Sequence, residues 1–379
     1  MIVAGVMSGT SADGVDVALV RLAGRRFRTR IELIAHDTFA YPAKVRAAVL
    51  TAMNAQSIAV SELAQLNFLL AEIYADCVRR TQRRSGVTCE LVGCHGQTIY
   101  HQGKVAKYLG RRIACTWQIG DGSVIANRLQ IPVVSDFRPA DMAAGGLGAP
   151  LVPFLDLLLF RHPRRGRIVQ NIGGIGNLTA IPAAASAEQV RAFDTGPGNM
   201  VIDALCEEFF GVAFDDQGNL AAKGSVLPAV LAEQMKSPFF RRRGSRTAGR
   251  EEFGREFVAA FLKRCGNAKP HDVLATATAL TARSIAAAVR SLSTKDQYRD
   301  LFVSGGGTRN WTLMEMIRRE VAGLGMEVSL TDAVGVPSQA KEAIAFAVLA
   351  YQSWHREPSS LPGATGAGRE VILGKVSYV

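Results

Sequence analysis

The stretch IVAGVMSGTSADGVDVALVRL, residues 2–22, decides the predicted fold. Its two ends, residues 2–7 and 15–22, are apolar and rich in Val, Ala and Leu, whereas its centre is a turn of Gly, Ser, Thr and Asp. This pattern predicts a β-hairpin with an unusually polar connection. Residues 27–39 alternate well enough to form a third strand. Apolar residues at helical spacing follow over residues 43–53 and 57–83.

The same order of elements begins again near residue 167. Strands are predicted over residues 167–171, 178–181, 190–193 and 300–304, and helices over residues 200–209, 253–265, 311–321 and 340–354. No sequence repeat can be aligned between the two halves, yet three strands followed by helices occur twice. We therefore predict an α/β protein of two similar lobes that face each other across a cleft.

Length and composition limit the classes of protein that remain. The 379 residues suffice for two to three common domains of roughly 150 residues each, or for two large lobes. Apolar residues make up 48% and charged residues 20% of the chain, which excludes a disordered or collagen-like protein. The net charge of +11 leaves a polyanion, a membrane surface and anionic small molecules open as partners.

The cysteines and the apolar segments bear on the location of the protein. The 6 cysteines contain no Cys-x-x-Cys pair, which indicates a reducing cytoplasm and no disulfide framework. Residues 1–9 lack a basic leader and are a poor secretory signal. Glycines and prolines interrupt the apolar stretch 143–160, so we expect no membrane span there.

Three glycine-rich turns each follow a predicted strand, at residues 9–14, 171–177 and 305–307. Glycine lets backbone N–H groups converge on an anion, which is what a polyphosphate requires. For any one of these turns a plain structural role is favoured, because strand ends often need a positive φ. Three such turns in one chain favour a nucleotide. None has the spacing of a P-loop or of a dinucleotide-binding fingerprint, so both folds are disfavoured.

Asp194 ends a predicted strand directly before the turn Gly196-Pro197-Gly198. It could act as a general base beside bound phosphates, as the aspartate of a kinase does. On residue type alone, a helix N-cap or a turn former is at least as common. The second glycine turn lies shortly before Asp194, and hairpin geometry would bring the two side by side, which favours the base.

Four polar residues are candidates for a sugar site, namely His95, Gln118, Asp121 and Arg138. His95 follows a short apolar strand, residues 91–93, and no nucleophile is paired with it. A structural histidine is the more common case. Each of the other three could instead be a surface or capping residue, and only their clustering near the predicted cleft supports a site.

Glu342 and two basic runs also have alternative interpretations. Glu342 lies on the apolar face of the predicted helix 340–354, where a carboxylate is costly unless it is paired or binds a metal. A salt bridge with a nearby lysine or arginine is the simpler alternative. The basic runs 161–167 and 241–246 match no nucleic-acid motif, so we expect them to be solvated, although part of the second run could face an anionic ligand.

Several blocks of the chain together resemble the anhydro-N-acetylmuramic acid kinase family. They are MSGTSADGVD at 7–16, CHGQT at 94–98, NIGGIGN at 171–177 and FDTGPGN at 193–199, and the match continues at 118–121, 136–138, 304–307, 342–347, 361–362 and 365–367. The resemblance implies an actin-like sugar-kinase fold of two ribonuclease-H-like lobes with ATP in the central cleft. The first lobe is expected to span residues 1–135, with residues 356–379 packing back on it, and the second lobe residues 136–355.

The resemblance also implies a reaction. ATP phosphorylates O6 of 1,6-anhydro-N-acetylmuramic acid while water opens the anhydro bridge at C1, which gives N-acetylmuramic acid 6-phosphate and ADP. Asp194 is then the base that activates this water, and Glu342 is a candidate ligand for Mg²⁺. The residues expected to bind ATP are Gly9, Thr10, Ser11, Ala12, Asp13, Gly14, Val15, Asp16, Asn171, Gly173, Gly174, Asn177, Gly305, Gly306, Gly307 and Asn310. A cytoplasmic homodimer without nucleic-acid or membrane partners is expected.

One departure from the wider superfamily concerns the metal. Many sugar kinases have an aspartate where this chain has Met7, and Ala12 and Lys341 are smaller deviations. Two rival functions stay open. A kinase of another anhydrosugar, such as levoglucosan, would use the same turns and base. A non-catalytic nucleotide sensor or actin-like assembly protein would share the two lobes, but it would not turn over ATP in response to an anhydrosugar.

Overall fold

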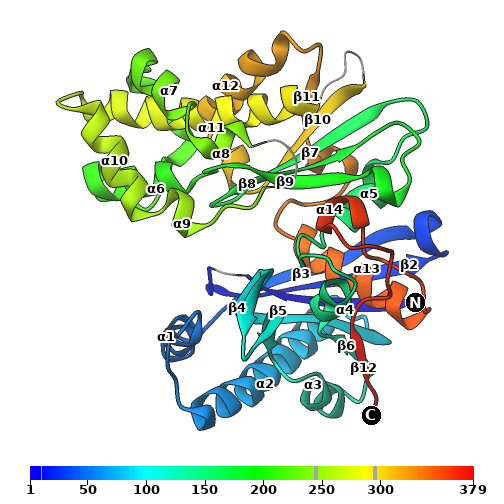
Figure 1. Ribbon diagram of the computed structural model, residues 1–379. Coiled ribbons are helices and arrows are strands. Elements are labelled where there is room, and N and C mark those ends of the chain that lie inside the picture. The colour runs from blue at the N-terminus through cyan, green and yellow to red at the C-terminus, as the bar shows by residue number, and fades with distance from the viewer. Residues whose placement is uncertain (10, 243–245, 293–296) are drawn as a thin grey trace. The chain divides into compact units, whose positions relative to one another are not determined.

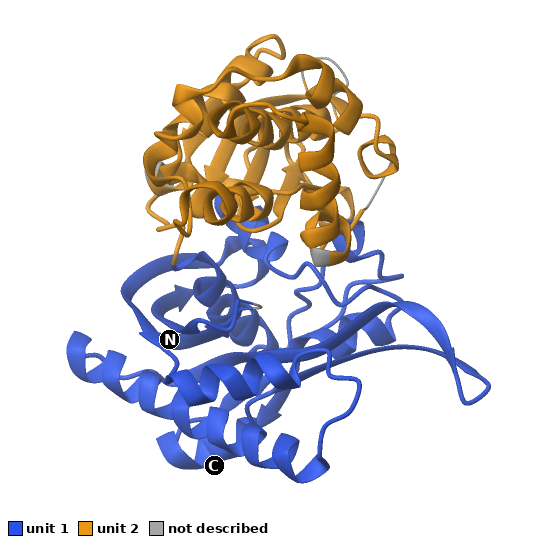
Figure 2. Ribbon diagram, turned by 90° about the vertical axis from the view of Figure 1, so that its left-hand side faces the viewer, with its two compact units in different colours: residues 1–159, 340–379 blue, residues 160–339 orange. Residues whose placement is uncertain are grey.

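The computed structural model describes residues 1–9, 11–242, 246–292 and 297–379. The chain forms two compact units, which Figure 2 shows in different colours. Unit 1 consists of residues 1–159 and 340–379, and unit 2 of residues 160–339. Each unit contains one sheet with helices, which confirms the predicted α/β class. Thr10 of the first glycine turn lies outside the described residues.

The sheet of unit 1 begins with the predicted hairpin. β1 (Ile2–Ser8), β2 (Gly14–Ala23) and β3 (Arg30–Ala40) are paired antiparallel. β4 (Leu91–Tyr108) runs parallel to β1, and β6 (Val133–Ser135) runs parallel to β4. β12 (Lys375–Ser377) pairs with β6, and β5 (Arg111–Ile119) pairs with β4 (Figure 1). The predicted strand 91–93 is therefore only the first part of a long two-stranded ribbon.

Helices cover both faces of this sheet, which explains why β1 is apolar at nearly every position. On one face, α2 (Val60–Ser85) packs with Ala4 and Val6 in a common core. On the other face, the backbone of α13 (Lys341–Trp354) lies directly against the strands. A Cβ atom at Gly5 would come within 1.8 Å of the Ala343 carbonyl oxygen, so only glycine permits this approach. The remaining helices of this part of the chain are α1 (Ala43–Ala52), α3 (Gly122–Leu129), α4 (Phe137–Ala143), α5 (Pro153–Phe160) and α14 (Pro362–Thr365).

Unit 2 repeats the topology of unit 1. β7 (Gly166–Ile172), β8 (Gly176–Ile181) and β9 (Arg191–Gly196) are paired antiparallel. β10 (Tyr298–Ser304) runs parallel to β7, and β11 (Glu327–Leu330) runs parallel to β10. In both units the third, second and first strands lie side by side, followed by two strands parallel to the first. This is the ribonuclease-H-like order that the resemblance implies.

The helices of unit 2 pack around this second sheet. α11 (Pro270–Leu292) and α12 (Trp311–Ala322) share a core with β7 and β10. α11 is long and apolar enough to cross a membrane, but most of it is buried within the unit, and buried core helices share this property. The other helices are α6 (Met200–Phe210), α7 (Pro228–Gln234), α8 (Pro238–Arg241), α9 (Arg250–Phe253) and α10 (Arg255–Cys265). Short 3-10 turns lie at Arg26–Arg28, Ala187–Gln189, Asp216–Gly218, Ala221–Lys223, Gly306–Arg309 and Thr331–Val334.

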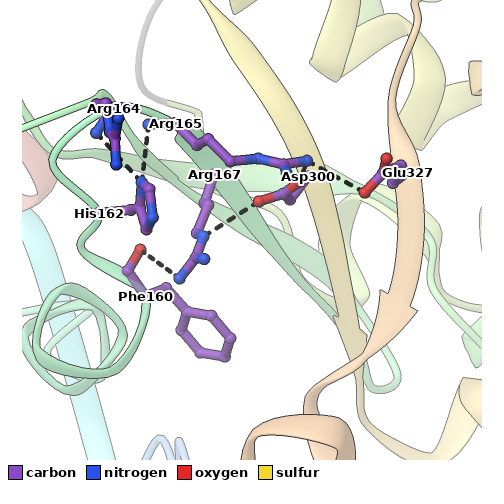
Figure 3. A network of polar contacts seen from close by, with 7 residues as sticks. All are labelled: Phe160, His162, Arg164, Arg165, Arg167, Asp300 and Glu327. Atoms are coloured by element: carbon purple, nitrogen blue, oxygen red, sulfur yellow. Dashed lines mark hydrogen bonds and ion pairs between the residues drawn. The ribbon is translucent and has the colours of Figure 1, made fainter.

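A network of hydrogen bonds and ion pairs connects the beginnings of the three parallel strands of unit 2, β7, β10 and β11 (Figure 3). The Asp300 carboxylate on β10 accepts hydrogen bonds from Arg165 and from Arg167 Nε, the latter at 3.1 Å. Arg165 also pairs with Glu327 on β11 at 3.1 Å, and Arg167 Nη1 donates to the Phe160 carbonyl oxygen at 3.4 Å. Two arginines of the basic run 161–167 therefore hold strands together, which differs from the expected solvated loop.

The units divide the chain differently from the predicted lobes. The first boundary lies at 159/160 and not at 135/136, so α4 and most of α5 belong to unit 1. The second lies at 339/340, so α13 also belongs to unit 1 and not to the second lobe. The physical reason is the close packing of α13 on β1 and β4, which composition does not reveal. Residues 356–379 lie in unit 1, where β12 pairs with β6.

Candidate active site

The first glycine turn, residues 9–14, connects β1 to β2 in unit 1. The Ala12 N–H donates to the Gly9 carbonyl oxygen at 3.1 Å, and Ala12 adopts a positive φ of 54°. The side chains of Ala12 and Val15 are buried in the core, so only their backbone groups could meet a ligand. The exposed Asp13 pairs with Arg46 at 3.0 Å. Ser11 is exposed, which leaves its hydroxyl open to a ligand.

A buried polar network holds this turn from below. Ser8 Oγ lies 2.6 Å from Gln97 Oε1, 2.8 Å from Tyr41 Oη and 3.0 Å from the Gly14 carbonyl oxygen. Gln97 Nε2 donates to the Gly9 carbonyl oxygen at 3.1 Å. Gln97 therefore contacts Ser8 before the turn and Gly9 within it. Sequence reasoning assigned Gln97 no role, although it lies in the CHGQT block.

His95 and Arg138 form the second polar group of unit 1. His95 is buried, with 4% of its surface exposed, and its Nδ1 lies 2.7 Å from the Gly96 carbonyl oxygen. Arg138, on α4, donates to His95 Nε2 from Nη2 at 2.7 Å and from Nε at 3.2 Å. Arg138 Nη1 donates to the Gly148 carbonyl oxygen at 2.8 Å. Two of the predicted sugar residues are therefore joined directly, because Arg138 donates hydrogen bonds to His95.

The two remaining sugar candidates have local partners. Gln118 Nε2 donates to Thr116 Oγ1 at 2.8 Å and to Thr98 Oγ1 at 3.2 Å on the ribbon. A Cβ atom at Gly96 would lie 3.4 Å from Gln118 Cβ, so Gln118 borders the His95 turn. Asp121 Oδ1 accepts the backbone N–H groups of Ser123 and Val124 and so caps α3. Asp121 therefore has the capping role that is one of its predicted alternatives.

Glu342 lies in the first turn of α13 and is exposed, which differs from the predicted burial. The surrounding protein nevertheless removes part of its hydration and raises the pKa of its carboxyl. The positive charge of Arg138 opposes this rise in pKa, and the negative charge of Asp16 adds to it. Asp16 itself accepts a hydrogen bond of 2.5 Å from Thr38 Oγ1. Glu342, Arg138 and Asp16 therefore act on one another electrostatically within unit 1.

The neighbouring Lys341 points into the protein. Its Nζ lies 2.7 Å from the Asp156 carboxylate, and both side chains are almost fully buried. The sequence alone does not explain a lysine among the apolar residues of this helix. Its buried partner Asp156 on α5 explains it. The pair joins α5 to α13. The chain leaves unit 1 at the end of α5 and returns to it just before α13 begins.

In unit 2 the other glycine turns meet at one end of the sheet. The Asn199 N–H donates to the Gly173 carbonyl oxygen at 2.8 Å, and Gly198 adopts a positive φ of 54°. A Cβ atom at Gly198 would lie 2.4 Å from that same oxygen. Gly305 has a φ of 90°, and a Cβ atom there would lie 2.6 Å from Asn171 Oδ1. The three turns after β7, β9 and β10 are thus in contact.

The remaining predicted ATP residues of unit 2 differ in their exposure. Gly174 and Gly306 are exposed, and Gly307 is buried against Ile172. Asn177 lies opposite Asp194 across the β8–β9 pair. Asn310 is buried, and its Oδ1 accepts the Leu313 N–H at 2.9 Å as the cap of α12. The helix therefore uses the Oδ1 of Asn310.

Asp194 lies two residues before the end of β9 and is half-buried beside these turns. Burial raises the pKa of its carboxyl to about 6, against a hydrogen bond from the Ala248 N–H and the charge of Arg246, which both lower it. The Ala248 bond reaches Oδ2 at 2.7 Å. Within the described part of the chain, no hydrogen bond to Oδ1 is formed, so this oxygen can accept a proton.

Arg246 lies beside Asp194 in unit 2, a contact that sequence reasoning missed. It is 6% exposed, and its Nε donates to the Asp194 carbonyl oxygen at 2.8 Å. Its guanidinium lies 5.2 Å from the ring centres of both Phe193 and Phe239. The end of the basic run 241–246 is therefore buried beside Asp194 and not solvated. Aromatic residues at 239 and 240 directly before the run were the available signal.

These features define a class of protein before any relative is considered. Two units of ribonuclease-H-like topology, with glycine turns at strand ends and a carboxylate beside them, are typical of kinases with the actin-like sugar-kinase fold. The whole chain, residues 1–379, matches the family described as Anhydro-N-acetylmuramic acid kinase. The chain therefore belongs to the anhydro-N-acetylmuramic acid kinase family.

Relatives across the full length support this membership. A protein of Bacillus cereus (strain AH187) named Anhydro-N-acetylmuramic acid kinase is 42% identical over 382 residues, which cover 100% of this chain and 99% of the relative. A protein of the same name from Bacillus thuringiensis subsp. konkukian (strain 97-27) is 40% identical with the same coverage. Among solved structures, a ROK family glucokinase from Streptomyces griseus is similar, at 14% identity, a TM-score of 0.40, and coverage of 93% of this chain and 100% of that chain.

Proposed function

We propose that this protein phosphorylates 1,6-anhydro-N-acetylmuramic acid with ATP during peptidoglycan recycling in the cytoplasm. Water attacks C1 and the bond from C1 to the bridging oxygen breaks. That oxygen, now O6, takes the γ-phosphoryl group while ADP leaves. The products are N-acetylmuramic acid 6-phosphate and ADP. Membership of the family supports the choice of substrate.

Asp194 is the proposed base, and its environment is the observation that carries the mechanism. A base works best when its pKa lies near the working pH, and burial raises the pKa of Asp194 to about 6. The Ala248 N–H holds Oδ2 at 2.7 Å, which orients the carboxyl and leaves Oδ1 for the water proton. Oriented water and a fixed base lower the entropic cost of the attack on C1.

The glycine turns are proposed to bind ATP through backbone N–H groups. In unit 2 the turns after β7, β9 and β10 meet, so their N–H groups lie around one region. In unit 1 the turn 9–14 is preset by Gln97 and Ser8. Preorganised donors stabilise charge in phosphoryl transfer without reorganisation during the reaction.

Mg²⁺ would be held by Glu342, with Asp16 as a second carboxylate. The residues fit a phosphate-bound ion, because Mg²⁺ in kinases commonly takes one or two carboxylates together with phosphate oxygens and water. Glu342 is exposed, and the charge of Asp16 acts on it. When bound, Mg²⁺ would neutralise charge on the phosphates. Arg138 carries a positive charge on the same side of the unit, where it attracts anionic groups of the substrates.

Gln118 and Arg138 are the proposed sugar contacts that keep free hydrogen-bonding capacity. Asp121 Oδ2 is also available, because the helix cap uses Oδ1.

We further infer a homodimer, a proposal that comes from the family resemblance alone. Nucleic acid and membranes are not expected partners, since the basic run 161–167 is partly paired within the protein.

The decisive experiment follows the reaction in ¹⁸O-labelled water. Label at C1 together with phosphate at O6 is the expected result. Phosphate on a sugar whose bridge stays closed would overturn the coupled reaction. ADP release with levoglucosan at an equal rate would favour the rival kinase, and no ADP release with any anhydrosugar would favour a nucleotide sensor.

A further inference from the structure

We propose that His95 is a positioning residue, which affects the reaction only by holding the Arg138 guanidinium and does not touch the sugar. This inference rests on the proposed function, because the reaction supplies its measurement. It replaces the predicted role of His95 as a sugar ligand. The hydrogen bonds of the two side chains carry it.

The partners of His95 determine which ring nitrogen carries the proton. A carbonyl oxygen can only accept, so Nδ1, 2.7 Å from the Gly96 carbonyl oxygen, must donate. Nε2 then presents its lone pair to Arg138, which has no acceptor and donates at 2.7 and 3.2 Å. Both ring nitrogens are used in this arrangement. No polar atom of His95 is left for a sugar hydroxyl.

The surroundings keep the imidazole neutral and in place. Burial and, after it, the charge of Arg138 lower the pKa of His95 well below its usual range. A proton on Nε2 would face the Arg138 donors, so the cationic ring is unfavourable. The ring packs on Phe346 with 4.6 Å between ring centres. Phe346 lies one helical turn after Glu342 on α13, so the same helix supports His95 and presents Glu342 to Arg138.

The choice of neutral partners has a consequence for Arg138. A carboxylate would hold the guanidinium equally well, but it would cancel its charge. Arg138 is held instead by His95 and by the Gly148 carbonyl oxygen. Among the described residues, the carboxylates of Glu342 and Asp141 act on its charge only from beyond the 4.0 Å of an ion pair. Its guanidinium has more N–H groups than these bonds use. Arg138 is therefore a fixed cation with free donors, which suits an anionic group such as phosphate or a sugar carboxylate.

A double-mutant cycle tests the inference. His95→Phe keeps the aromatic contact with Phe346 but removes the acceptor, and Arg138→Met keeps the length of the stem but removes the guanidinium. We expect His95→Phe to lower kcat/KM by about 30-fold in the wild type and by less than about 3-fold in the Arg138→Met background. Equal fold losses in both backgrounds would show that His95 acts independently of Arg138 and would overturn the inference.

Two further variants separate positioning from folding. His95→Asn, whose side-chain oxygen can accept from Arg138, is expected to recover part of the activity, and it serves as the single variant if His95→Phe does not fold. Phe346→Leu loosens the packing of the same ring and keeps both hydrogen-bonding nitrogens, so its fold loss is expected to be smaller than that of His95→Phe in the wild type and to shrink further in the Arg138→Met background. A wild-type protein inactive on the anhydrosugar would refute the proposed function alone, and the cycle would then be measured on the sugar it accepts.

Discussion

The Ala248 N–H donates a 2.7 Å hydrogen bond to the Asp194 carboxylate across 54 positions of the chain. This bond occupies one oxygen and leaves the other free to receive a proton. Asp194→Asn keeps the size and the Ala248 contact but cannot act as a base. We expect it to bind ATP and sugar normally and to lower kcat by at least ~100-fold. Near-normal turnover in a coupled ADP-release assay would remove Asp194 from the mechanism.

The pKa of Asp194 predicts two opposite pH trends. Because the base must be ionised, kcat/KM should rise with pH through about 6. The folded pKa of about 6 exceeds the ordinary value of 3.8, so protonation of Asp194 favours the folded state. That contribution is full below pH 3.8 and is lost as pH rises through about 6. The Tm of Asp194→Asn relative to wild type should therefore rise from pH 4 to pH 7, and a flat difference would contradict the raised pKa.

Arg246 is predicted to support Asp194 structurally. Arg246→Met keeps an apolar stem but loses the bond to the Asp194 carbonyl oxygen, and it should destabilise the protein by about 2 kcal/mol in urea unfolding. Since residues 246–248 contact Asp194 at three points, kcat should fall as well. The control is Arg241→Met in the same run, where the side chain is exposed and little change is expected. Equal effects at both positions would contradict a specific role.

Gln97 is predicted to set the first glycine turn. Gln97→Leu conserves the approximate volume but removes one hydrogen bond from the Gly9 carbonyl oxygen and one from Ser8, each of which keeps another partner. At about 1 kcal/mol for each lost bond, the change should cost about 2 kcal/mol. A looser turn should raise the KM for ATP more than it lowers kcat. Gln102→Leu, on the same strand but in the exposed ribbon, should leave the KM for ATP unchanged. An unchanged KM in Gln97→Leu would show that the network does not shape the turn.

The buried pair of Lys341 and Asp156 predicts a stability effect. Lys341→Met removes the cation that lies 2.7 Å from the buried Asp156 carboxylate and should cost about 3 kcal/mol. The double variant Lys341→Met/Asp156→Asn removes the charge and should recover part of that loss. Lys375→Met, which disturbs an exposed pair with Asp136 at 3.9 Å, is the control and should change stability little. A double variant less stable than the single one would contradict the loss of this charge pairing as the cause.

Part of the fold and site follows from local sequence. The hairpin at residues 2–22 and the order of strands and helices come from apolar periodicity, because these patterns depend on neighbouring residues. Asp194 and the glycine turns at 171–177 and 305–307 could be singled out because they follow predicted strands. The structure brings these three features together in unit 2.

Other parts of the site could not be predicted. Glu342 was expected in the core from the apolar residues around it, but the side of α13 that faces the sheet is set by Gly5 and Gly93 on distant strands. Arg246 looked like part of a solvated basic run, and only its packing on Phe193 and Phe239 shows that it is buried. His95 could be a sugar ligand or, more commonly, a structural histidine, and only its contacts with Gly96 and Arg138 show how the ring is held.

The sequence by itself determined the α/β class, the doubled order of elements and membership of the kinase family, because periodicity and ordered motifs are properties of the chain. Only the tertiary structure decided that α13 belongs to unit 1, that His95 binds Arg138, and that Arg246 lies beside Asp194. The physical reason is that burial and hydrogen bonding are settled by residues 43 and 52 positions apart, which no local pattern records.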